Sequence, residues 1–248
     1  MIARTPNAHL PGERDLRARK LGVRAGRGFS LIELLVVMSV AILLTALMMP
    51  AMQQLRENAQ RVVCMSNMQQ LGRAFMMYGG DHNDELPESE ALVERSLPQE
   101  LMLARTAGRG GAWDGLGHLY ELHYCDTPEC FYCPSHHGQH LFERYAGMWE
   151  QAAPCDTIYT NYHYAGQMEW NRNRRRMLTE GYKLVLSTDG LRTAGDFNHI
   201  QGMNTLRGDG SVHWCDDTEG ILKVLPQTET EQVSAAYFDL WDLVQQAK

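Results

Sequence analysis

The longest apolar run of the chain lies close to its N-terminus. From Phe29 to Met49 there are 21 residues with a single charge, Glu33. At a helical rise of about 1.5 Å per residue this run spans about 31 Å, the thickness of the hydrocarbon core of a bilayer. We therefore predict a transmembrane helix over residues 29–50. The basic segment before it is expected to stay cytoplasmic, with the rest of the chain outside.

The hydrophobic pattern changes after Pro50. Between Leu55 and Tyr78 the apolar residues recur every three or four positions, which is the spacing of one buried stripe on a helix. The same helix is therefore predicted to leave the membrane and to become amphipathic over residues 51–78. Two glycines follow and are expected to end it. Its apolar stripe is suited to carry a globular head.

The remaining residues, 79–248, predict one head domain, so that the fold class is α+β: a long N-terminal helix packed on a small antiparallel β-sheet. Strands are expected at 158–164, 184–187, 203–207 and 211–215. Asp209-Gly210 separates the last two strands and predicts a hairpin, because this turn needs residues that tolerate positive φ. Helical spacing also predicts helices at 90–107 and 233–244.

The net charge of the chain and the motifs it lacks exclude several classes of function. The first 28 residues carry seven basic and two acidic side chains, so their removal changes the formal net charge from −7 to −12. Nucleic acid is therefore not expected as a partner, since its binding depends on neutralising phosphates. The sequence contains no Walker A loop, no Gly-x-Ser-x-Gly elbow, no His-Glu-x-x-His and no Rossmann fingerprint. We accordingly predict that the chain is not an enzyme.

The junction between the basic and apolar segments carries the run GFSLIE, residues 28–33. This run resembles the class III signal of type IV pilins and type II secretion pseudopilins. The resemblance implies that a prepilin peptidase cuts between Gly28 and Phe29, releasing residues 1–28 as a leader, and that Phe29 is N-methylated. Transfer of a carboxylate into the hydrocarbon core of a bilayer costs free energy. We therefore expect Glu33 to pair, in an assembled filament, with the ammonium of Phe29 in a neighbouring subunit.

All six cysteines lie beyond the transmembrane segment, in a compartment where disulfides persist. Cys64, on the helix, is left unassigned. Cys133 is expected to pair with Cys125 or Cys130. The disulfide candidates are Cys125, Cys130, Cys133, Cys155 and Cys215. The alternative is a zinc knuckle, since the spacing of the first three and the nearby His136, His137 and His140 suit that metal.

A second resemblance covers most of the head. His199 is followed after nine residues by Asp209 and a glycine, an Asp-Gly pair begins at Asp189, and the run YCPS occupies residues 132–135. This pattern resembles the His-x9-Asp-Gly signature of pilin-like proteins abundant in Planctomycetes and their relatives, which implies no activity. Asp189, His199 and Asp209 could converge at one end of the sheet and bind a divalent cation. The favoured interpretation is that Asp209 only makes the turn and His199 hydrogen-bonds a loop.

Two charged segments are interpreted as solvated loops. Residues 81–85 offer oxygen ligands for calcium, but they lack the spacing of an EF-hand. Residues 172–176 contain four arginines, and a site for an acidic polymer or a lipid headgroup is the alternative interpretation there.

The sequence therefore predicts a structural subunit of a type IV pilus-like or type II secretion pseudopilus-like filament. Its expected partners are the prepilin peptidase, other pilin or pseudopilin subunits and the inner membrane. The expected location is single-pass in the inner membrane with the head in the periplasm. No cofactor is expected beyond a divalent cation. The alternative is a membrane-anchored extracytoplasmic metal-dependent enzyme or ligand-binding protein.

Overall fold

A computed structural model of the chain describes residues 28–89, 102–107, 110–164, 178, 185–191, 193–199, 201–217, 220, 225, 241 and 244. The chain divides into two compact units, Met1–Met49 and Pro50–Lys248. Residues 1–27 of the expected leader, the first part of the predicted helix at 90–107 and the arginines of 172–176 lie outside the described residues. Of the predicted C-terminal helix only Trp241 and Val244 are described, and both are helical.

The predicted long helix is confirmed. Helix α1 (Leu31–Asp81) contains 51 residues and continues through Pro50, which corresponds to a length of about 75 Å. Its large apolar residues up to Met49 are exposed, and by length and composition the helix could cross a membrane. It ends one residue beyond the predicted glycines, where Asp84, at a φ of 68°, donates its N–H to the Gly79 carbonyl at 2.8 Å.

The amphipathic stripe is confirmed over the last turns of α1 only. Its buried residues are Cys64, Met68, Leu71, Gly72, Ala74, Phe75, Tyr78 and Gly79. Leu55 and Val62, which the sequence placed in the same stripe, are 63% and 65% exposed. Within the described part of the chain, the buried stripe of α1 begins at Cys64, and the apolar positions before it stay at the surface.

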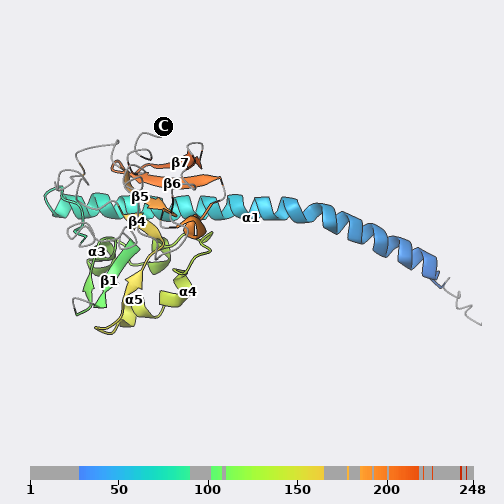
Figure 1. The fold of residues 1–248 in the computed structure, drawn as a ribbon, viewed down its shortest axis with the longest axis horizontal. Coiled ribbons are helices and arrows are strands. Elements are labelled where there is room, and N and C mark those ends of the chain that lie inside the picture. Colours follow the sequence, from blue (N-terminus) through green and yellow to red (C-terminus); the bar gives the residue numbers. More distant parts are fainter. Residues whose placement is uncertain are drawn as a thin grey trace, which may run out of the picture. The chain divides into compact units, whose positions relative to one another are not determined.

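A four-stranded antiparallel sheet follows the sequence prediction closely. Its strands run in the order β4-β5-β6-β7. In the view of Figure 1, β6 and β7 lie on one side of α1, and β1 (Leu103–Thr106), α4 (Phe142–Tyr145) and α5 (Met148–Gln151) lie on the other. The bounds are β4 (Tyr162–Tyr164), β5 (Val185–Asp189), β6 (Gly202–Arg207) and β7 (Val212–Asp216). The predicted hairpin joins β6 to β7, and Gly210 in its turn has a φ of 78°.

A second, three-stranded antiparallel sheet corrects two predictions. It has the order β2-β1-β3, with β1 (Leu103–Thr106), β2 (Ala112–Trp113) and β3 (Ile158–Tyr159). The end of the predicted helix at 90–107 is therefore a strand, because pairing with strands on both sides outweighs the helical propensity of its residues. The predicted strand at 158–164 is split between the two sheets, as β3 and β4.

Short helices complete the described part of the head. They are α3 (Gly117–Glu121), the 3-10 helix η3 (Pro128–Phe131), α4 (Phe142–Tyr145), α5 (Met148–Gln151) and the 3-10 helix η5 (Ala194–Asp196). Aromatic side chains join them: the ring of Trp149 stacks on Phe131 with centroids 4.9 Å apart and meets Tyr120 edge-on at the same distance. This aromatic layer and the stripe of α1 belong to one hydrophobic core.

Candidate functional site

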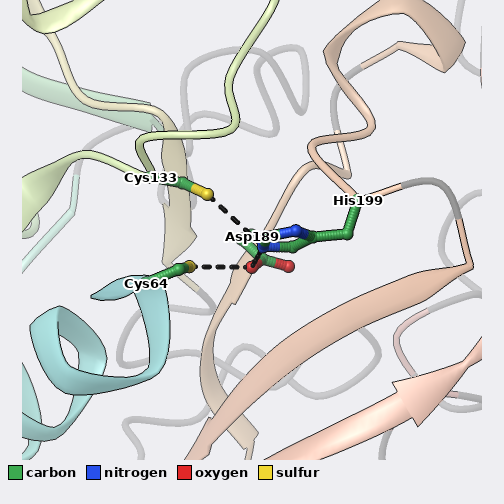
Figure 2. A group of neighbouring side chains, drawn as sticks. All are labelled: Cys64, Cys133, Asp189 and His199. Atoms are coloured by element: carbon green, nitrogen blue, oxygen red, sulfur yellow. Dashed lines mark hydrogen bonds and ion pairs between the residues drawn. The ribbon is translucent and has the colours of Figure 1, made fainter. Parts of the chain in front are cut away.

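Four side chains with metal-binding atoms converge in the interior of the head. Cys64 comes from α1, Cys133 follows η3, Asp189 ends β5 and His199 precedes β6 (Figure 2). One potential ligand atom from each lies within 4.8 Å of the other three. Their exposed fractions are 0%, 3%, 1% and 1%. We refer to these four residues as the buried four-residue cluster.

Cys64 enters the cluster because it begins the buried stripe of α1. Its thiol donates to Asp189 Oδ2 at 3.0 Å, and the hydroxyl of Tyr162 donates to its Sγ at 3.4 Å. Burial is the main reason why the pKa of the Cys64 thiol lies well above its ordinary value. The thiol is therefore protonated at neutral pH unless a cation compensates the charge of the thiolate.

Asp189 is oriented by the neighbouring strand. Asn204 of β6 donates its backbone N–H to Oδ1 at 2.7 Å and its side-chain amide to Oδ2 at 2.9 Å. Gly190, with a φ of 79°, lets the chain turn away directly after the aspartate. The carboxylate is thus fixed at the end of β5, with Oδ2 directed at both Cys64 and His199.

His199 is held between two carboxylates. Its Nδ1 lies 2.6 Å from Glu57 Oε1 of α1, and its Nε2 lies 3.2 Å from Asp189 Oδ2. The contact with Glu57 determines that Nε2 is the ring nitrogen facing the cluster. Burial by itself lowers the pKa of His199, but hydrogen bonds and charge from Asp189 and Cys64 outweigh it and raise the pKa to about 11.

Cys133 is positioned through its backbone. The side chain of Asn161, just before β4, accepts from the backbone N–H of Cys133 and donates to its carbonyl at 3.3 Å. The thiol then lies 3.5 Å from His199 Nε2. Burial raises the pKa of this thiol as well, so both cysteines of the cluster share the same preference for the neutral form.

The cysteine pairing differs from the expectation for Cys133. Cys125 and Cys130 form a disulfide with each other, whereas Cys133 is a free buried thiol. Cys130 lies within η3, five residues after its partner Cys125, while Asn161 holds Cys133 toward His199. The other two disulfide candidates are also free thiols: Cys155 is exposed and Cys215 is buried.

The zinc knuckle considered from the sequence does not form, because two of its three cysteines are oxidised to a disulfide. Its histidines have other partners: His136 Nδ1 lies 2.6 Å from Asn198 Oδ1, and His140 Nδ1 lies 2.7 Å from the hydroxyl of Tyr145. His137 is exposed. Only Cys133 of that group contributes to the cluster.

Of the predicted cation ligands, Asp189 and His199 come together and Asp209 lies elsewhere. Asp209 is in the β6–β7 turn, where its Oδ1 accepts from the backbone N–H of Ser211 at 2.9 Å and from its hydroxyl at 2.6 Å. These bonds lower the pKa of Asp209. The turn role favoured for Asp209 is thus the one observed, whereas His199 contacts Glu57 of α1 and Asp189 of β5 besides Cys133 in the loop after η3.

Sequence reasoning missed Glu57 and left Cys64 without a role. The two residues are seven positions apart, which places them on one face of α1 two turns from each other. A cysteine within an otherwise apolar stripe, preceded by an acid at that spacing, was the available signal. It could not identify Cys133 or Asp189 as partners, because these lie 69 and 125 residues further along the chain.

A surface pocket adjoins the cluster. It has a volume of about 320 Å³ and is lined by Pro50, Gln53, Gln54, Glu57, Asn58, Arg61, His199, Gln201 and Trp214. The guanidinium of Arg61 lies 3.3 Å from the ring centroid of Trp214, a cation–π contact. Of the four cluster residues His199 lines this pocket, together with Glu57, which contacts its Nδ1.

The predicted processing site lies at the start of α1. Gly28, Phe29 and Ser30 precede the helix and are exposed. Ser30 caps it: the backbone N–H of Ser30 donates to Glu33 Oε2 at 2.9 Å, and the backbone N–H of Ile32 donates to Ser30 Oγ at 3.4 Å. This reciprocal arrangement is a capping box, a local role for Glu33 that the sequence interpretation did not include.

Comparison of the chain with protein-family models, with curated proteins and with solved structures finds no match. Function is therefore inferred from the residues and their geometry.

Proposed function

We propose that this protein is a membrane-anchored structural subunit of a type IV pilus-like or type II secretion pseudopilus-like filament, processed by a prepilin peptidase. The observation that carries the proposal is the division of α1. One continuous helix exposes its large apolar residues up to Met49, while its residues from Cys64 onward form part of the core of an α+β head.

The exposed half of α1 needs an apolar environment. Burying a large aliphatic side chain is worth about 1.5–3 kcal/mol, and this helix exposes such residues on every side. A helix that is apolar all round is typical of a membrane span or of the centre of a helical bundle. A filament subunit uses both environments in turn, first the bilayer and then the helices of its neighbours.

The start of α1 suits proteolytic processing. The bond between Gly28 and Phe29 lies outside the helix, and Phe29 is 84% exposed. Because Gly28 has no atom within 4 Å of the position its Cβ would take, the segment is not held by packing. A protease can therefore reach the bond that the resemblance to class III signals designates.

The composition of the buried four-residue cluster argues against the alternative of a metal-dependent enzyme. Catalytic zinc sites keep one coordination position for water or substrate, whereas structural sites are closed by four protein ligands. The cluster offers four protein donors, all of them buried. This favours a structural role for the head over a catalytic one.

The test measures both cleavage of the chain by the peptidase and assembly of the cleaved chain into multimers. The full chain is expressed with and without a prepilin peptidase, and intact-mass measurement is expected to give a mature chain that begins at Phe29 only when the peptidase is present. A photo-crosslinking residue at Val36, which is exposed on α1, is then expected to give a ladder of multimers in cells that contain the assembly components. The same probe at Glu121, exposed on the head, serves as the control.

Gly28→Leu is the matched variant for the first step. It should insert into the membrane, remain uncut and lose the multimer ladder. An uncut wild-type chain in the presence of the peptidase, or a cleaved chain that stays monomeric in those cells, would contradict the proposal.

A further inference from the structure

We propose that Cys64, Cys133, Asp189 and His199 bind one zinc ion, which joins α1 to the head as a structural centre. This inference concerns the stability of the head and does not depend on filament formation. It is carried by the positions of the four donor atoms, by their chemical types and by the residues that orient them.

Three separations between donor atoms are close to those that a tetrahedral zinc ion requires. Tetrahedral zinc, with bonds of about 2.3 Å to sulfur and about 2.0–2.2 Å to nitrogen or oxygen, keeps neighbouring ligand atoms about 3.3–3.8 Å apart. In the cluster, Cys133 Sγ lies 3.5 Å from His199 Nε2, His199 Nε2 lies 3.2 Å from Asp189 Oδ2, and Asp189 Oδ2 lies 3.0 Å from Cys64 Sγ. The remaining separations are at most 4.8 Å.

The donor types select the metal. Calcium and magnesium prefer oxygen ligands, whereas two thiolates, one imidazole and one carboxylate in tetrahedral array are typical of zinc. Four protein donors also fill the coordination shell, which is the pattern of structural zinc sites. Figure 2 shows the four side chains directed at a common centre from separate parts of the chain.

The ligands are oriented by a second layer of contacts. Glu57 holds Nδ1 of His199 at 2.6 Å, which leaves Nε2 for the metal, and Asn204 fixes both oxygens of Asp189. Asn161 holds the backbone of Cys133. A carboxylate behind a histidine ligand and hydrogen bonds behind a carboxylate ligand are the usual supports of protein metal sites.

Binding exchanges protons for the ion. Cysteine binds zinc as a thiolate and histidine binds it through an unprotonated ring nitrogen, so zinc binding releases the protons of both thiols, and any proton on Nε2 of His199, to solvent. The ion then places two positive charges among two thiolates and a carboxylate. A buried cation thus compensates charges that burial would otherwise disfavour, and no oxidant or reductant takes part.

The site would fasten segments that are distant in sequence. Cys64 is on α1, whereas Cys133, Asp189 and His199 lie on three segments of the head. An ion shared by all four closes long loops of chain, and such a link stabilises a small domain mainly by restricting its unfolded state. The histidine of the His-x9-Asp-Gly pattern thereby acquires a structural role.

The first experiment measures metal content. The full chain, purified in detergent under reducing conditions without chelators, is expected to contain one zinc per chain. Cys133→Ser and His199→Ala should each lose it. Cys215→Ser removes another buried free thiol, and Asp209→Asn changes the third residue of the sequence-predicted cation set; both are expected to keep the zinc.

The first two measurements of the second experiment do not depend on a ligand variant retaining its fold. Glu57→Gln keeps all four donors but weakens the support of His199, so zinc affinity in a chelator competition is expected to fall about 10- to 100-fold. In the wild type, cobalt substitution should give thiolate-to-cobalt charge transfer in the near ultraviolet and the visible bands of tetrahedral cobalt. Cys64→Ser should weaken the charge transfer and shift these bands.

Three results would overturn the inference. The first is a wild-type chain that takes up no zinc after reconstitution under reducing conditions. The second is zinc content that Cys133→Ser and His199→Ala leave unchanged, or another metal at the same stoichiometry. The third is a Cys64–Cys133 disulfide in protein isolated directly from cells. A negative result in the processing and crosslinking test would leave this inference intact.

Discussion

Gly210 of the β6–β7 turn lies so close to Gly72 of α1 that it leaves little room for a side chain on the helix residue. A Cβ at Gly72 would lie 3.1 Å from both the Cα and the carbonyl oxygen of Gly210, and 2.9 Å from Leu206 Cδ1. The hairpin therefore docks on the helix through its turn. Together with the contact between His199 and Glu57, this fixes both ends of the His-x9-Asp-Gly segment to α1.

Gly72→Ala is expected to destabilise the head by about 1–3 kcal/mol, because the new methyl group would lie 3.1 Å from backbone atoms of Gly210, which must shift to admit it. The measurement is the urea unfolding midpoint of the full chain in detergent, followed by tryptophan fluorescence. All five tryptophans lie beyond residue 112, so the signal reports on the head.

Gly80→Ala is the matched control for this variant. Gly80 is also in α1 and has nothing within 4 Å of the position of a Cβ. There the substitution should be neutral or stabilising by up to about 1 kcal/mol, from helical propensity alone. Equal effects of the two substitutions would contradict the close contact between helix and hairpin.

Asp209 should stabilise the hairpin only while it is ionised. Its folded-state pKa lies below the ordinary 3.8 because of the hydrogen bonds from Ser211, so its contribution is present above about pH 4 and is lost as the pH falls through the folded pKa. Asp209→Asn keeps an Asn-Gly turn but removes the charge. Because the residue is exposed, we expect a loss of about 0.3–0.5 kcal/mol at neutral pH.

The difference in urea midpoint between wild type and Asp209→Asn, measured at neutral pH and at about pH 3, tests this dependence. Other titrating groups affect both chains alike and cancel in the difference. A difference in urea midpoint that persists unchanged at the lower pH would show that the charge of Asp209 does not cause the difference.

The disulfide pattern makes a prediction for thiol labelling. In denaturant without reductant and with a zinc chelator, an alkylating reagent should modify Cys64, Cys133, Cys155 and Cys215 and should leave Cys125 and Cys130 unmodified. In the native chain the exposed Cys155 should react first. Peptide mass mapping reads the result directly.

Loss of the Cys125–Cys130 disulfide should lower the free energy of unfolding moderately. It closes a loop with a sequence separation of 5, for which chain entropy gives about 2 kcal/mol. Cys125→Ala/Cys130→Ala is therefore expected to lower the unfolding free energy by about that amount and to leave the zinc content unchanged. Labelling of either residue in the wild type would contradict the pairing.

Local sequence signals predicted the parts of the fold that local physics determines. The long helix follows from an apolar run and a stripe at helical spacing, and the β6–β7 hairpin follows from Asp209-Gly210, since that turn requires positive φ. Strand β1 was missed because its state depends on pairing with β2 and β3, which residue propensities do not encode.

Two of the four cluster residues, Asp189 and His199, were predicted from the sequence. The other two were missed because their place in the site also depends on contacts between distant segments. Asp189, His199 and Asp209 stood out as members of the His-x9-Asp-Gly pattern and its preceding Asp-Gly pair, and they were expected to converge at one end of the sheet. Cys64 and Cys133 belong to the site only because α1 packs against the head at Cys64 and Asn161 turns Cys133 inward. Such convergence of distant segments is a tertiary property.

The last prediction separates two roles of Glu33. In the structure its carboxylate accepts from the backbone N–H of Ser30, a cap that an isolated subunit uses. In a filament, the same carboxylate is expected to pair with the Phe29 ammonium of a neighbour, because each charge alone is costly in a low-dielectric layer. Glu33→Ala removes both interactions, whereas Glu33→Gln keeps a neutral oxygen that can still cap Ser30.

We expect both variants to insert, to be cleaved after Gly28 and to keep the fold of the head, and both to enter filaments poorly beside wild-type subunits. The measurement is the yield of crosslinked multimers through the Val36 probe at equal membrane levels of each form. Normal assembly of Glu33→Gln with defective assembly of Glu33→Ala would assign Glu33 to the cap. Normal assembly of both variants would mean that the carboxylate has no part in subunit contacts. The only charge within the apolar run would then be dispensable for the packing of its helix.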